Sequence, residues 1–138
     1  MLHQQMIKTK NKKALYDIVS NNDGISRASL AHKTKLSKST ISLLVDELIA
    51  EDMLIDIGIV ESGLQGRKPN GLRVNVERFI LIANVRKKSV EIHAINLLYE
   101  TEEDSIYPYD IRLDAEYLSG IITEYLTKYG TKVLGVCV

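Results

Sequence analysis

A helical repeat of hydrophobic residues dominates the stretch from residue 37 to residue 50. Its apolar positions lie at i, i+3, i+4, i+7 and i+8 and form one stripe of an α-helix: Ile41, Leu44, Val45, Leu48 and Ile49. Ser37 stands directly before the repeat and is a favourable N-cap. No acidic residue occurs in this stretch before Asp46. The pattern predicts a long helix with a buried face and an exposed, acid-free start.

Two further helical segments precede this long helix. The first is expected over residues 6–20, where the "NNDG" of residues 21–24 ends it. The second is short, over about residues 27–33, with Ser26 as its N-cap. The residues expected to face inward are Ala14, Leu15, Ile18 and Val19 in the first segment and Ala28, Leu30 and Ala31 in the second. Because a tight turn joins the second segment to the long helix, the pattern is that of a helix-turn-helix.

The period of the pattern changes after the long helix. Alternating apolar residues at 54–59 and the segment "LRVN" at 72–75 predict two β-strands. The glycine-containing loop "ESGLQGRKPNG" between them predicts a hairpin. A hairpin that directly follows a helix-turn-helix is a wing, so we expect residues 1–75 to form a winged helix-turn-helix domain.

Residues 76–138 predict a mixed α/β unit. Strands are expected at "RFILIANV", "SVEIHAINL" and "ETEEDSIYPYD", and the acidic run "ETEED" is typical of a charged edge strand. A helix is expected over residues 113–129, with its inward face formed by Leu118, Ile121, Ile122 and Leu126. The apolar "KVLGVCV" predicts a fourth, buried strand. The expected fold class is therefore α+β.

Composition excludes several function classes. The chain has 138 residues, of which 45% are hydrophobic and 26% charged, and these values suit a globular protein. No apolar run approaches the roughly 18 residues of a membrane span, and the polar start lacks the apolar region of a signal peptide. We therefore expect a cytoplasmic protein without a membrane partner. Cys137 is the single cysteine and the histidines are scattered, so we expect neither an internal disulfide nor a metal site.

The formal net charge of zero conceals an asymmetry. Residues 1–75 carry a net charge of +3 and residues 76–138 a net charge of −3. Residues 1–45 alone hold eight Lys or Arg against two Asp. A basic amino-terminal lobe favours a polyanion as partner. On charge alone, a solvated lysine face is an equally good interpretation.

Two stretches of sequence carry a family resemblance. "ISRASLAHKTKLSKSTISLLVDELIAEDMLIDIG" followed by "GRKPNGLRVN" resembles the winged helix-turn-helix of the ROK transcriptional repressors, a sugar-responsive group that includes xylose and N-acetylglucosamine repressors. The pattern of residues 76–138 is similar to the beginning of the actin-like, ribonuclease H-like ROK domain. The resemblance implies a partial, truncated ROK domain here. It also leaves a sugar effector open, because the chain ends before the family's sugar-binding and zinc-binding motifs.

Two positions depart from the family's pattern. Lys35 stands in the turn where the relatives usually carry glycine, so a positive φ there should cost up to about 1 kcal/mol. Leu43 stands in the long helix where the relatives often have arginine, whose bidentate pairing with guanine is the commonest specific base contact. This helix must therefore read bases differently.

The start of the long helix supplies most of the expected DNA contacts. Its backbone N–H groups and positive dipole end attract a phosphate, to which side chains add further contacts. On the exposed face, Leu43 suits packing against a thymine methyl. The expected DNA contacts are Arg27, Ser37, Lys38, Ser39, Thr40, Ser42 and Leu43, together with Arg67 and Lys68 of the wing, which would enter a minor groove or touch phosphate. The alternatives are that Ser37 only caps, Thr40 faces inward, Leu43 packs on a neighbouring chain, and the wing residues lie in a solvated loop.

The ROK family also includes sugar kinases, and residues 83–89 bear on that activity. Those enzymes place an Asp-x-Gly-x-Thr phosphate loop between the first two strands of the domain. Here the segment reads "ANVRKKS", so that Asn84 replaces the acid and Arg86 and Lys88 replace Gly and Thr. We therefore expect no kinase activity, no catalytic residue and no cofactor. The basic turn itself is expected to be solvated, with an anion site as the alternative.

These observations favour a sequence-specific, DNA-binding transcriptional regulator, expected to repress carbohydrate-related genes. Its expected partners are double-stranded DNA and a second copy of the chain, because one winged helix reads only a few base pairs. The dimer surface is expected in residues 76–138, at the apolar "VLGVCV", with the first helix as the alternative. Two other functions remain open: a degenerate sugar-binding or kinase-like module without phosphotransfer activity, and a winged helix used only for protein contacts.

Overall fold

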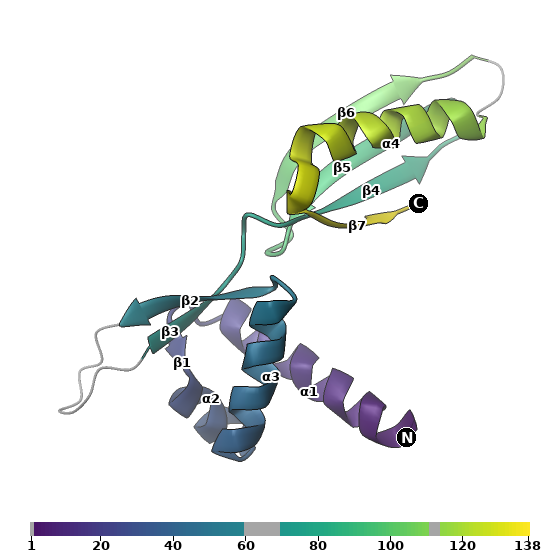
Figure 1. The fold of residues 1–138 in the computed structure, drawn as a ribbon. Helices are drawn as coiled ribbons and strands as arrows, with labels where there is room; N and C mark the ends of the chain where they lie inside the picture. The colour runs from purple at the N-terminus through teal and green to yellow at the C-terminus, as the bar shows by residue number, and fades with distance from the viewer. Residues whose placement is uncertain (1, 60–69, 111–113) are drawn as a thin grey trace. The chain divides into compact units, whose positions relative to one another are not determined.

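The computed structural model describes residues 2–59, 70–110 and 114–138 (Figure 1). The chain divides into two compact units, Met1–Asn75 and Val76–Val138. Each unit has its own β-sheet. No helix in the described ranges is long and apolar enough to cross a membrane.

Three helices form most of the amino-terminal unit: α1 (Leu2–Ser20), α2 (Arg27–Thr34) and α3 (Lys38–Ala50). The predicted caps are confirmed, because the hydroxyl of Ser26 accepts a hydrogen bond at the start of α2 and the hydroxyl of Ser37 does so at the start of α3. Helix α1 begins earlier than the expected Met6. Its buried residues start only at Leu15, so the hydrophobic period does not mark its first turns.

The core of this unit lies between the three helices and a small sheet. Its buried apolar residues are Leu15, Tyr16, Val19, Ile25, Leu30, Ile41, Leu44, Val45, Leu48, Leu54, Leu72 and Val74. The predicted stripe of α3 is buried, apart from the half-buried Ile49. Ala14 and Ala28 were expected inward but are exposed. Larger neighbours decide which helix face is buried, because they remove more apolar surface from water than a methyl group does.

The small sheet contains the predicted hairpin. Strands β2 (Leu54–Ile59) and β3 (Asn70–Val74) are antiparallel, and β1 (Ile25–Ser26) pairs with the other edge of β3. The sheet order is β1-β3-β2. The sequence did not predict β1, because two residues are too few to display a period. The loop that joins β2 to β3, with Arg67 and Lys68, lies outside the described residues.

The carboxyl-terminal unit is a mixed sheet with one helix over it (Figure 1). Its elements are β4 (Phe79–Val85), β5 (Ser89–Asn96), β6 (Thr101–Pro108), α4 (Ala115–Tyr129), the short 3-10 helix η1 (Gly130–Lys132) and β7 (Val133–Cys137). The sheet order is β6-β5-β4-β7, in which β7 runs parallel to β4 and the other pairs are antiparallel. Helix α4 packs its Ile121 and Tyr125 against alternating residues of β4 and β5. The expected strands, the helix and the mixed α/β class are confirmed.

Two expectations about burial in this unit are wrong. Strand β7 was expected to be buried, but Leu134 and Val136 are 41% and 39% exposed. A buried parallel strand needs neighbours on both edges and cover on both faces. Within the described residues, β7 lies at the sheet edge and pairs only with β4. Leu126 is also exposed, because Tyr125 takes the inward position on α4.

Candidate nucleic-acid interface

The turn between α2 and α3 has a left-handed residue at Lys35. Its φ is 59° and its ψ is 16°, a conformation that costs a non-glycine residue about 1 kcal/mol or more. The hydroxyl of Thr34 donates to the carbonyl of Leu30 over 2.8 Å and accepts from the amide of Leu36 over 3.3 Å. The turn therefore keeps the glycine-type conformation with a lysine in place, and Thr34 holds both of its sides.

The start of α3 gathers three of the predicted hydroxyl groups. The oxygen of Ser37 accepts from the amide of Thr40 over 3.1 Å. It also lies 2.9 Å from the hydroxyl of Ser39 and 2.7 Å from that of Thr40. The first turn of a helix leaves amide groups without partners inside the helix. Hydroxyls and amides at this end can thus meet an anion together.

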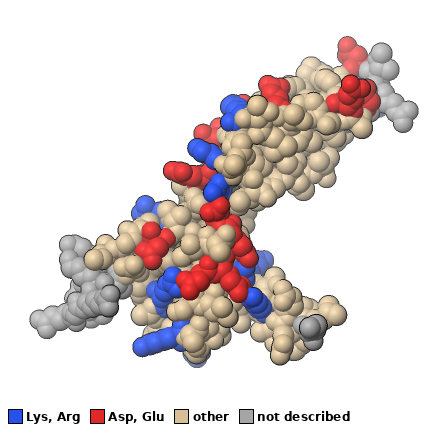
Figure 2. Space-filling view, in the orientation of Figure 1, with Lys and Arg blue, Asp and Glu red and all other residues tan. Residues whose placement is uncertain are grey.

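Charge is distributed unequally along α3. Lys33, Lys35 and Lys38 lie at the turn and the helix start, and all three are exposed. They form no ion pair within the described part of the chain. Figure 2 shows Lys and Arg side chains over α2 and the start of α3, whereas Asp and Glu gather over the carboxyl-terminal part of α3. A polyanion is therefore attracted to the start of α3 and repelled from its end.

Part of the basic charge of this unit is neutralised internally. Lys8 Nζ lies 2.6 Å from a carboxylate oxygen of Glu47, and Lys12 Nζ lies 2.5 Å from one of Glu51. The hydrogen bond from Lys8 holds the pKa of Glu47 below its ordinary value of 4.5. These pairs join α1 to α3, so the count of basic residues overstates the charge available to a partner.

Arg27 also has an acidic neighbour. Its Nη1 lies 2.8 Å from Oδ1 of Asp46 and donates to the backbone carbonyl of Ser42 over 3.3 Å. The Arg27 side chain is 32% exposed. The structure thus places this predicted DNA contact against α3.

The other predicted residues of α3 differ in exposure. Leu43 is 58% exposed, and Ser37, Lys38 and Ser39 are exposed as well. Thr40 and Ser42 are half-buried. Leu43 follows Ser39 by about one helical turn, so the exposed Ser39 and Leu43 share one face of α3.

An ion pair that the sequence did not predict holds the base of the hairpin. Arg73 Nε and Nη2 donate to the two carboxylate oxygens of Asp23 over 2.6 Å and 2.7 Å. This bidentate contact joins β3 to the loop after α1. The hydrogen bond from Arg73 lowers the pKa of Asp23 below its ordinary value of 3.8. No local signal marks the pair, because its members lie 50 residues apart.

Comparison with known families identifies the domain. Residues 8–60 match the model of a family described as winged helix-turn-helix DNA-binding. The amino-terminal unit is a winged helix-turn-helix domain. Helices α2 and α3 with their turn are its helix-turn-helix, and the β2–β3 hairpin is its wing.

This winged helix-turn-helix domain has relatives among the xylose repressors. The Bacillus subtilis (strain 168) xylose repressor is 41% identical over 66 residues, which are 48% of this chain and 17% of that protein. The Lactiplantibacillus pentosus xylose repressor is 31% identical over 75 residues, which are 54% of this chain and 19% of that protein. The chain therefore spans less than a fifth of the length of these relatives.

A solved structure shares the fold over nearly the whole chain. It is described as a ROK family transcriptional regulator, homolog of the E. coli MLC protein. The TM-score is 0.70 at 22% sequence identity, and the match covers 94% of this chain and 34% of the other. Together with the xylose repressors, this match confirms the predicted resemblance to ROK regulators.

Proposed function

We propose that the protein is a sequence-specific, DNA-binding transcriptional regulator that represses carbohydrate-related genes. The exposed start of α3 carries this proposal: Ser37, Lys38 and Ser39 meet there, on a helix whose acids lie at the opposite end. The winged helix-turn-helix match supports DNA as the ligand. The similarity to xylose repressors supports repression and the link to carbohydrates.

In the proposed complex, the start of α3 binds a phosphate and its exposed face meets base edges. Backbone amides of the first turn and the Lys38 ammonium hold the phosphate, and the hydroxyls of Ser39 and Thr40 add hydrogen bonds. This contact fixes the helix in the major groove. Leu43 then packs on a thymine methyl, and Ser42 reaches a base edge beside it.

The wing supplies a second contact in this proposal. Arg67 and Lys68 bind the minor groove or the phosphate backbone beside the site read by α3. The Asp23–Arg73 ion pair anchors β3, the strand from which the wing extends. Anchoring β3 in this way lowers the cost of ordering that strand on binding.

We further propose that the chain is not a kinase. Two of the residues that replace the kinase phosphate loop bind one carboxylate: the Asn84 amide and Arg86 Nε each donate to Glu91 over 3.1 Å. The hydroxyl of Tyr109 donates to the backbone carbonyl of Arg86. A loop held in this way offers ATP no glycine backbone, and the carboxylate beside it, Glu91, is already bound by Asn84 and Arg86. We also propose a cytoplasmic location, because the xylose repressors that the chain resembles come from bacteria.

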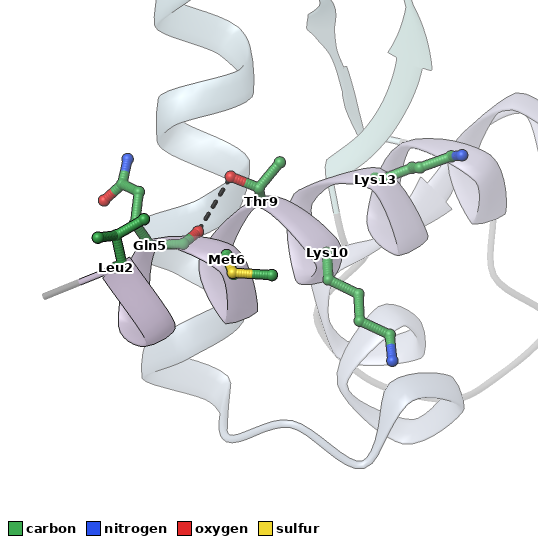
Figure 3. A pocket seen from close by; sticks show the side chains of 6 residues that line it. All are labelled: Leu2, Gln5, Met6, Thr9, Lys10 and Lys13. Atoms are coloured by element: carbon green, nitrogen blue, oxygen red, sulfur yellow. Dashed lines mark hydrogen bonds between the residues drawn. The ribbon is translucent and has the colours of Figure 1, made fainter.

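The proposed regulator acts as a homodimer. Paired domains read two half-sites and gain the affinity that a single domain lacks. The exposed β7 edge, with Leu134 and Val136, is the surface we assign to this contact. The alternative surface is the exposed face of α1, where Leu2 and Met6 are 82% and 66% exposed (Figure 3). Lys10 and Lys13 lie farther along that face of α1.

Selection of duplexes from a random-sequence library, followed by titration of variants, tests the proposal. Lys38→Glu should weaken binding to selected and scrambled duplexes alike, because a phosphate contact carries no sequence information. Leu43→Ala should change the preference among sequences. Lys87→Glu, in the β4–β5 turn of the other unit, is the matched charge control. Failure to enrich any sequence, or an equal loss for Lys38→Glu and Lys87→Glu, would contradict the proposal.

A further inference from the structure

An ion pair joins Arg27, the first residue of α2, to Asp46 in the carboxyl-terminal half of α3. Arg27 Nη1 contacts both the Asp46 carboxylate and the Ser42 carbonyl, at 2.8 Å and 3.3 Å. Asp46 follows Ser42 by about one helical turn, so a single guanidinium nitrogen bridges that turn of α3. Two thirds of the Arg27 side chain is covered by protein, since its exposed fraction is 32%.

We propose that Arg27 is a positioning residue that sets the placement of α3 against α2, and that it does not bind DNA. The inference rests on the proposed function, in which α3 is the helix that reads bases. Arg27 binds the backbone of Ser42, and Leu43 is the next residue. Ser39 lies about one turn before Leu43 on the same side of the helix. The Arg27–Asp46 pair thus fixes the segment of α3 that carries base recognition.

The charges around Arg27 argue against a phosphate contact. The Asp46 side chain is 64% exposed, so a phosphate approaching Arg27 would also approach this carboxylate. The two anions repel each other, and Arg27 would have to abandon Asp46 to bind the phosphate. Lys38 has no ion pair within the described ranges and lies at the start of α3. The phosphate is therefore better placed at Lys38 than at Arg27.

The chemistry of arginine separates the two roles experimentally. A planar guanidinium can keep a carboxylate and a carbonyl in fixed geometry, whereas a lysine ammonium is a flexible point charge. Arg27→Lys preserves the positive charge and hence any counterion release at this position. Arg27→Lys does, however, remove the fixed geometry of the guanidinium contact with Asp46 and Ser42. Asp46→Asn removes the carboxylate and leaves Arg27 in place.

The test uses the full chain, a duplex selected by the wild-type protein from a random library, and a scrambled duplex of equal length. Affinities for both duplexes are measured at several salt concentrations for wild type, Arg27→Lys, Arg27→Ala, Asp46→Asn and the combined Arg27→Ala/Asp46→Asn chain. Asp17→Asn, which removes an exposed acid of α1, is the charge control. Circular dichroism verifies that each chain is folded. If Arg27→Ala does not fold, Arg27→Lys and Asp46→Asn are sufficient to test the proposal.

The positioning role predicts a lower ratio of the two affinities in each Arg27 and Asp46 variant, by about two- to fivefold, the range expected from an exposed ion pair. The slope of log affinity against log salt should equal that of the wild type. The combined variant should lose no more than the worse single variant, because both changes break one interaction. The control should keep the wild-type ratio.

Three results would overturn this assignment. A phosphate contact at Arg27 is indicated if Arg27→Ala lowers the slope of log affinity against log salt by about 0.9 and leaves the ratio of the two affinities unchanged. Asp46→Asn that changes binding to both duplexes equally leaves the ratio intact and so contradicts the positioning role. Independent, additive losses in the combined variant exclude a shared interaction. A wild-type chain that binds neither duplex is a separate outcome, since it refutes the proposed function itself and with it a positioning role in DNA recognition.

Discussion

Replacing Lys35 by glycine should stabilise the winged helix-turn-helix domain. Lys35 has a φ of 59° at the end of α2, in the left-handed region that glycine enters without a steric penalty. Its side chain is exposed and forms no ion pair within the described residues, so the substitution removes no packing. Relief of the Cβ clash is worth about 1–2 kcal/mol. Glycine has more conformational freedom in the unfolded chain, and this offsets about 0.5–1 kcal/mol of that stabilisation.

The net expectation is a gain of about 0.5–1 kcal/mol in the free energy of unfolding. In a domain of this size, such a gain raises Tm by roughly 2–8 °C. Urea denaturation of the chain truncated after Asn75, followed by circular dichroism, measures the change. Tyr16 is the only tyrosine of this unit and is buried, so its fluorescence gives a second probe of the same transition.

Lys35→Ala is the matched control, because it removes the same charge but keeps a Cβ atom. The alanine variant should be about as stable as the wild type, while both variants should lose the same DNA affinity if Lys35 attracts the phosphate backbone. A glycine variant that is no more stable than the alanine variant would refute the reasoning, since position 35 would then carry no left-handed strain.

Three other predictions follow from the described contacts. Asp23→Asn should lower the free energy of unfolding by up to about 1 kcal/mol at neutral pH. Arg73 lowers the pKa of Asp23, so the stabilisation by this pair is complete above the ordinary value of 3.8. It is lost as the pH falls through the lower folded-state pKa. Urea titrations of both chains across pH check this, and a difference that does not shrink as the pH is lowered below 3.8 would contradict it. Sedimentation should give a dimer for the full chain and a monomer for the chain truncated after Asn75, whereas equal dimerisation of both would transfer the contact to α1. Incubation with ATP, magnesium and hexoses should give no phosphorylated sugar, and phosphoryl transfer that is lost on changing Asn84 would reverse that conclusion.

Features that depend on local sequence could be predicted. The caps Ser26 and Ser37 lie directly before the helices they start, and the stripe of α3 repeats with the period of its own helix. Strands β4 and β5 alternate buried and less buried residues along their length, so their pattern is visible in the sequence. The exposed face of α3 follows from the same periodicity, since it lies opposite the stripe.

Features that depend on distant neighbours could not be predicted. The Arg27–Asp46 and Asp23–Arg73 pairs join residues whose proximity only the folded chain creates. The apolar sequence of β7 indicates a strand but does not say how many neighbours that strand has. The lysines of α1 illustrate the same limit for charge, because Glu47 of α3 and Glu51 at its C-cap neutralise two of them.

Titration of the full chain with a mixed-sequence DNA duplex at two salt concentrations tests the central claim most directly. Lys33, Lys35 and Lys38 surround the start of α3 without an ion pair in the described structure. If these three neutralise phosphates, a rise from about 50 to 200 mM salt should lower the affinity of one domain roughly fortyfold. Absence of binding at the lower concentration, or an affinity that stays the same at both, would contradict the assignment of this surface to DNA.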